Sequence, residues 1–94
     1  METATKHPHI VRNDSILSGE PIIVGTRTSV RAVVESWRLG KSPEEICQAF
    51  PAVSLAQVFD ALSYFEDNRL EIQELISRNL VAESEVHPLL CAKA

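Results

Sequence analysis

Short apolar runs separated by turn residues occupy the first third of the chain. Ile10 and Val11 form one run, and residues 21–24 form a second that is rich in β-branched side chains. The stretch between them ends in Ser-Gly-Glu-Pro, a turn signal in which glycine and proline favour a reversal of the chain. We therefore predict a β-hairpin over residues 9–28, preceded by a flexible segment over residues 1–8. Because an isolated hairpin is marginal in water, it must pack on the rest of the chain or pair with another copy.

The apolar spacing changes to that of a helix after residue 28. Four apolar side chains fall at i, i+3, i+4 and i+7, on one face of a helix: Val30, Val33, Val34 and Trp37. Thr28 or Ser29 can cap the start of this helix, and Gly40 suits its end. These positions predict a first helix over residues 29–39.

Two further helices begin at serine-based caps. The sequence Ser-Pro-Glu-Glu at 42–45 places a serine at the N-cap, proline in the first turn and glutamate three residues after the cap, and Pro51 ends this helix. Ser54 and Gln57 repeat the capping pattern at the start of a third helix. The second and third helices, with the short break between them, have the spacing of a helix-turn-helix.

An apolar stripe continues beyond the third helix to about residue 82. Its spacing is consistent with one long helix, although Asn68 and Glu71 could cap a separate one. We expect the small core to be complete without the end of the stripe, from Val33, Val34, Trp37, Ile46, Phe50, Val58, Leu62 and Phe65. The remaining apolar residues are then expected to face a second copy or another protein: Ile72, Leu75, Ile76, Leu80, Leu89 and Leu90. Residues 9–82 would form one domain, and residues 83–94 a flexible tail.

Composition and charge narrow the class of protein. The chain has 94 residues and a net charge of −4, and the excess of acidic groups falls entirely after residue 54. This balance argues against nucleic-acid binding by bulk charge alone. No apolar run approaches the roughly 18 residues that span a bilayer, so we expect a cytoplasmic protein. Cys47 and Cys91 lack metal-ligand spacing, and we expect neither a metal nor a cofactor.

Candidate chemistry points to binding rather than catalysis. The chain has no Ser/His/Asp or Cys/His grouping and no glycine-rich phosphate loop, so we expect no enzyme. On a DNA-binding interpretation Arg27 and Arg31 would contact phosphates, while Ser54, Gln57 and Asp60 would lie on the third helix, where Gln57 could read adenine and Asp60 cytosine. For the third helix, the alternative is an ordinary solvated face. For Arg27, the alternative is a structural role in which its guanidinium ties the hairpin to nearby carbonyls or a carboxylate.

The order of several unusual residues resembles a known family. The stretch from Gly19 to Phe65 reads "GEPIIVGTRTSV", a helix ending in glycine, "SPEEI", Phe-Pro and "ALSYF". The matching positions are Gly19, Pro21, Ile23, Gly25, Thr26, Arg27, Gly40, Ser42 to Ile46, Phe50, Pro51, Ala61, Leu62 and Tyr64. They resemble the bacterial domain of unknown function numbered 433, which is similar to the DNA-binding part of VapB-type antitoxins. Thr28 and Ser29 stand where an apolar residue and proline are frequent in that family.

The resemblance implies both a fold and a setting. The fold would be a homeodomain-like three-helix bundle, preceded by the hairpin and followed by a C-terminal helix. The setting would be a type II toxin–antitoxin system in which a homodimer binds its own promoter DNA and neutralises a PIN-like ribonuclease. The alternative is a protein–protein interaction module of the same shape that does not bind DNA, as the acidic third helix suggests.

Overall fold

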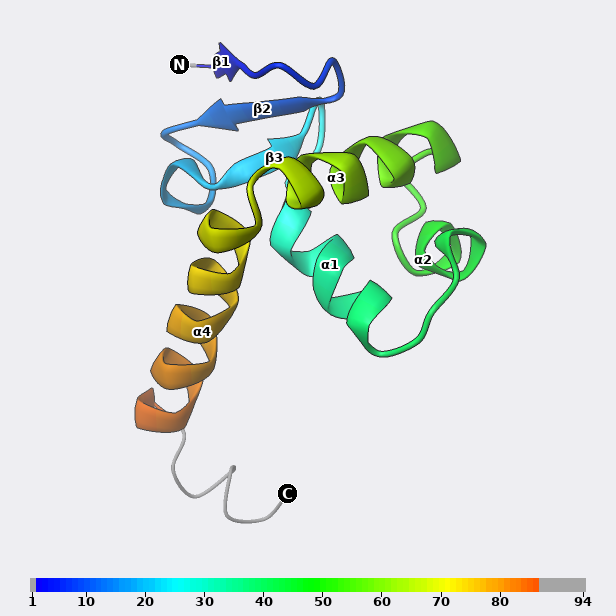
Figure 1. Ribbon diagram of the computed structural model, residues 1–94. Coiled ribbons are helices and arrows are strands. Elements are labelled where there is room, and N and C mark those ends of the chain that lie inside the picture. The colour runs from blue at the N-terminus through cyan, green and yellow to red at the C-terminus, as the bar shows by residue number, and fades with distance from the viewer. Residues whose placement is uncertain (1, 87–94) are drawn as a thin grey trace.

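A computed structural model describes the backbone of residues 2–86 and the side chains as far as residue 79 (Figure 1). Over these residues the chain is mainly helical, with a small antiparallel sheet near its N-terminus. The elements in chain order are β1 Glu2–Ala4, β2 Ile10–Asn13, the 3₁₀ turn η1 Leu17–Gly19, β3 Pro21–Ile23, α1 Val30–Arg38, α2 Pro43–Ala49, α3 Leu55–Asp67 and α4 Arg69–Val86.

The predicted hairpin is confirmed and gains a third strand. β2 and β3 pair antiparallel with Ile10 opposite Ile23, and both side chains are fully buried in the helical core. The hairpin is therefore held by packing on the helices. β1 adds to the other edge of β2, giving the order β1-β2-β3. This strand lies within residues 1–8, where the sequence analysis expected a flexible segment rather than a strand.

Local capping explains where three of the helices begin. The Ser29 hydroxyl accepts a hydrogen bond from the Ala32 amide at 3.0 Å at the start of α1. Ser42 with Glu45, and Ser54 with Gln57, form the two predicted capping boxes of α2 and α3. The first two predicted helices are confirmed to within a residue or two at each end, and the third begins where it was predicted.

The apolar stripe that begins in α3 does not continue along one straight helix. Asn68 leaves helical geometry with φ −137° and ψ 44°, and its side-chain amide donates to the Tyr64 carbonyl at 3.0 Å. The chain turns there, so that α4 packs against α1 while its far end runs away from the sheet (Figure 1). Of the two alternatives that the sequence left open, a separate fourth helix is correct.

Two expectations about burial, one for α4 and one for Trp37, are wrong. Ile72 and Ile76 are 0% and 8% exposed and belong to the chain's own core, because the start of α4 folds back onto α1 instead of extending toward a partner. Trp37, expected in the core, is 45% exposed, because the last turn of α1 is covered on one side only by the short α2 and by α3. Phe50 and Leu62 pack at the border of the core.

No helix in the described part of the chain has the length and apolar character needed to cross a bilayer.

Candidate functional site

The corner between β3 and α1 is held by Thr26 rather than by Arg27. The Thr26 hydroxyl donates to the Ile23 carbonyl at 2.8 Å and accepts from the Thr28 amide at 3.0 Å. Gly25 precedes it with φ +76°, a conformation that glycine adopts without strain. Arg27 is exposed, and its guanidinium makes no hydrogen bond or ion pair with any residue that the structure describes. The structural role expected for Arg27 is therefore wrong, because the shorter neighbouring hydroxyl reaches the backbone groups instead.

Arg31 is committed to two carboxylates. Its Nε donates to Glu20 at 3.0 Å and its terminal nitrogen donates to Glu35 at 3.2 Å. The side chain is only 17% exposed. Arg31 therefore links α1 to the loop before β3, and the two acidic partners neutralise the charge that a phosphate contact would need.

The three candidate residues on α3 also have partners within the chain. Ser54 and Gln57 bond to each other's backbone amides in the capping box at the helix start. Asp60 accepts from the His9 backbone amide at 2.8 Å and contacts the His7 ring at 3.2 Å. The structure thus brings Ser54 and Gln57 together as a cap, and it uses Asp60 to hold the N-terminal segment.

His7 forms a clasp that the sequence analysis did not identify. Its Nδ1 lies 3.2 Å from Asp60 and its Nε2 lies 3.0 Å from Asp67, while its ring packs edge-on against Tyr64 with centroids 5.3 Å apart. The His7 side chain is only 11% exposed. These partners are more than fifty residues away in sequence, so no local pattern marks them.

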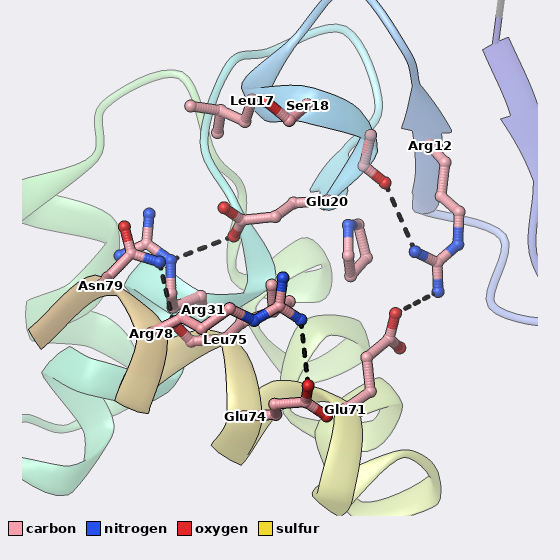
Figure 2. A pocket seen from close by; sticks show the side chains of 12 residues that line it. Arg12, Leu17, Ser18, Glu20, Arg31, Glu71, Glu74, Leu75, Arg78 and Asn79 are labelled. Carbon is pink, nitrogen blue, oxygen red and sulfur yellow. Dashed lines mark hydrogen bonds and ion pairs between the residues drawn. The ribbon is translucent and has the colours of Figure 1, made fainter. Parts of the chain in front are cut away.

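A polar cleft of about 730 Å³ lies between η1 and α4, and Figure 2 shows its ion pairs. Arg12 bonds to Glu71, Arg31 to Glu20, and Arg78 to Glu74. Three arginines and three glutamates therefore line the cleft, and their charges balance. Because each guanidinium already has a carboxylate partner, the cleft does not concentrate the positive charge that would select an anion.

Tyr64 connects this cleft to the His7 clasp. Its hydroxyl donates to Glu71 at 2.8 Å and accepts from Arg12 at 2.7 Å. Burial raises the pKa of Tyr64 to about 12, and the Glu71 carboxylate adds to this rise while Arg12 opposes it. The phenol therefore stays protonated and acts as a fixed hydrogen-bond donor within the fold.

An apolar groove of about 370 Å³ lies between α1, α2 and α3. Its lining is apolar except for Ser63 and Glu66, and consists otherwise of Trp37, Pro43, Phe59, Leu62 and Phe65. Trp37 and Phe59 are 45% and 54% exposed, which is unusual for such large side chains. The groove is therefore suited to accept apolar side chains from outside.

Two of the three helices that form this groove, α2 and α3, are acidic in composition. Residues 42–68, which comprise α2, the turn and α3, contain no lysine or arginine and five acidic residues: Glu44, Glu45, Asp60, Glu66 and Asp67. Arg38 and Arg69 stack on the Phe65 ring at the groove's edge, with guanidinium carbons 5.6 and 4.9 Å from the ring centre. A helix pair with this charge repels a phosphate backbone.

Among the remaining predicted partner residues, Leu75 lines the cleft between η1 and α4. Leu75 is half-buried beside the core. The Leu80 side chain, Leu89 and Leu90 lie outside the described part of the chain. Among the described residues, no group of three or more His, Cys, Asp or Glu side chains is placed to hold a metal ion.

Comparison with known proteins places most of the folded region in one family. Residues 10–65, more than half of the chain, match the family described as protein of unknown function (DUF433). The match spans the hairpin, α1, α2 and most of α3. No curated protein and no solved structure was found to match the chain.

Proposed function

The chain belongs to DUF433, a family of proteins of unknown function, and we propose that it acts as an antitoxin-like module that binds and neutralises a protein partner. The partner implied by the family resemblance is a PIN-like ribonuclease. One observation carries the proposal: large apolar side chains are exposed around one groove, led by Trp37 on α1 and Phe59 on α3.

The exposed apolar side chains and the acidic composition of α2 and α3 both favour a protein partner. Burying exposed aromatic side chains is a large source of binding free energy at protein interfaces. A ribonuclease must attract RNA and therefore carries a basic surface, which the acidic residues 42–68 complement. In this role the chain would cover that basic surface and block access of RNA.

The direct test is co-expression of the full chain with each PIN-like ribonuclease encoded in the same genome. We expect one of them to be toxic alone, to be neutralised by the chain and to co-purify with it at a fixed ratio. The complex should weaken as salt rises, because charge attraction is screened. Toxicity that the chain never relieves would contradict the antitoxin role.

Promoter binding is a second candidate function, supported by the arrangement of the helices and by Arg27. α2 and α3 are each capped by a serine and are separated by residues 50–54, and α1 packs across both helices. Arg27 is exposed and donates no hydrogen bond to any described residue. These features are compatible with a homeodomain-like helix-turn-helix that docks as a homodimer.

Fluorescence anisotropy on the DNA upstream of the gene tests this second function. A specific complex whose affinity falls steeply with salt would support it, since each neutralised phosphate adds about one unit to the slope of log affinity against log salt. An absence of DNA binding at low salt would contradict promoter binding, and the protein-binding function would be the one that remains proposed.

A further inference from the structure

The strand β1 has an open edge. The strand order is β1-β2-β3, and Figure 1 shows β1 at the outside of the sheet with no element of the described chain beyond it. The far edge of β3 is closed, because Ile22 forms a bridge with Ser29. The Ile23 amide also donates to the Thr28 carbonyl there, at 2.9 Å. An open edge presents backbone N–H and C=O groups that can pair with another strand.

The side chains of this edge do little to prevent such pairing. Glu2, Thr3 and Ala4 are all exposed and contribute nothing to the core. Residues 2–6 contain no proline. Neither Glu2 nor Lys6 forms an ion pair with any residue that the structure describes. The protective feature of the edge is its shortness, which limits a pairing strand to a few backbone hydrogen bonds.

The sequence of this segment is complementary to itself in the antiparallel direction. Residues 2–6 read Glu-Thr-Ala-Thr-Lys, which is symmetric about Ala4 except for the opposite charges at its two ends. If two copies run antiparallel with Ala4 opposite Ala4, then Thr3 lies opposite Thr5, and Glu2 lies opposite Lys6 at both ends. Opposite charges and β-branched side chains in directly opposed positions stabilise a pair of strands. A parallel, in-register pairing would instead place each of the two charges against its own kind.

The structure is compatible with this register. Residues 2–4 are already extended as β1. The Thr5 hydroxyl donates to the Ile10 carbonyl at 2.7 Å, which holds the segment beside the start of β2 for one more residue. The chain bends at Lys6, whose side chain is exposed. Backbone pairing is therefore limited to residues 2–5, and the long Lys6 side chain completes the contact with the glutamate of the other copy.

We propose that β1 is an interface between two copies of this chain, which join through an antiparallel pair of β1 strands. Both copies contribute the same residues, as a two-fold dimer requires. Such short strands bury much less than the roughly 1,200 Å² of a stable interface, so the dimer is weak and depends on its charge pairs. The inference goes beyond the neutralisation of a ribonuclease and does not depend on it. It specifies the homodimer through which promoter binding would act.

Reversal of charge at the two ends of the segment tests the pairing. Sedimentation equilibrium on the full chain, with no tag before residue 1, measures dimerisation. We expect a reversible dimer that weakens as salt rises, because salt screens the charge pairs. Lys6→Glu places like charges opposite each other at both ends and should weaken the dimer about tenfold or more. Glu2→Lys should have an effect of the same size.

Two combinations and one control make the test specific for the antiparallel register. The double variant Glu2→Lys with Lys6→Glu restores opposite charges and should dimerise within about twofold of the parent chain. An equimolar mixture of the two single variants should form a heterodimer, because one carries two lysines at these positions and the other two glutamates. Lys41→Glu makes the same change of charge at an exposed lysine before α2, so it should leave the dimer unchanged. Circular dichroism melts establish that all variants fold.

Hydrogen exchange then locates the interface. We expect the amides of residues 2–5 to gain protection as the protein concentration rises. A parent chain that stays monomeric up to about millimolar concentration would overturn the inference. So would single variants that dimerise like the parent, or a double variant that fails to recover. Protection that appears only when a ribonuclease is bound would show that a strand of that partner occupies the edge, and the inference fails. Neutralisation of a ribonuclease by a chain that is always monomeric would leave the proposed function standing without this dimer.

Discussion

The part of the molecule around the sheet, called here the sheet side, has its charged side chains paired. The part around α2, called here the α2 side, leaves large apolar side chains exposed. On the sheet side, charged groups are paired across elements: Arg31 with Glu20, Arg12 with Glu71, and His7 with two aspartates. On the α2 side, Trp37 and Phe59 remain about half exposed. In the described part of the chain no buried polar side-chain atom lacks a hydrogen-bond partner.

This difference distinguishes side chains that stabilise the fold from side chains that are available to bind a partner. Half-buried charges are costly unless they are paired, so the polar groups of the sheet side are explained by the fold itself. Exposed aromatic surface has no such explanation, and each Å² of it that a partner covers contributes about 25 cal/mol. The paired polar groups of the sheet side are therefore a less promising binding site than the apolar groove.

The largest expected effect comes from testing whether α4 belongs to the folded body. Ile72→Ala should lower the free energy of unfolding by about 2–5 kcal/mol, because the fully buried side chain would leave a cavity. Leu70→Ala, two residues earlier on the same helix, should change it by less than about 0.5 kcal/mol, since Leu70 is 83% exposed. Urea denaturation compares the two. Small effects for both would mean that α4 does not pack on α1.

A smaller loss is expected from opening the clasp on the sheet side. Asp60→Ala removes the acceptor of the His9 amide and one partner of the His7 ring, and should cost about 1–3 kcal/mol of unfolding free energy. Glu66→Ala is the control on the same helix, because it breaks only an exposed pair with Arg69 and should cost at most about 1 kcal/mol. Equal urea midpoints for the two variants would contradict the structural role of Asp60.

The Tyr64 titration probes the same polar side by pH. Its folded pKa of about 12 lies above the ordinary value of 10.0, so the protonated phenol is favoured by folding. Its contribution to stability is complete below about pH 10 and is lost as the pH rises through about 12. Tyr64 is the only tyrosine, so phenolate absorbance reports it alone. Glu71→Gln should move the titration to lower pH, and an unchanged titration would exclude the Glu71 contact.

The helix starts could be predicted from sequence because their causes are local. A serine cap and its partner three residues later act within one turn, so Ser42 with Glu45 and Ser54 with Gln57 are identifiable without a structure. The hairpin is predictable for the same reason, from two short apolar runs and a turn. The break at Asn68 is ambiguous, because the capping pattern and the continuing apolar stripe give conflicting local signals.

The features that could not be predicted depend on contacts between distant segments. Asp60 and Arg12 find their partners 51 to 59 residues away, and periodicity carries no information about such pairs. Trp37 has the spacing of a core residue, yet its exposure is decided by how far α2 and α3 extend over it. Residue type alone suggests the candidate DNA contacts. The spacing of Arg31 and Glu35 predicts their ion pair, but only the structure reveals that Arg31 also binds Glu20 and that Asp60 binds the His9 amide.

The smallest expected effect is at the corner between β3 and α1, where two adjacent residues form a matched pair. Thr26→Ala should cost about 1 kcal/mol of stability, because it removes a hydroxyl that both donates to and accepts from the backbone. Arg27→Ala should change stability by less than about 0.5 kcal/mol, since the exposed guanidinium holds nothing in the described structure. Suppose that Arg27→Ala melts like the parent chain but binds upstream DNA with a shallower salt dependence. Arg27 would then be a phosphate contact, and partner-binding residues would not be limited to the α2 side. If it destabilises the fold as much as Thr26→Ala does, Arg27 belongs with the paired arginines of the sheet side.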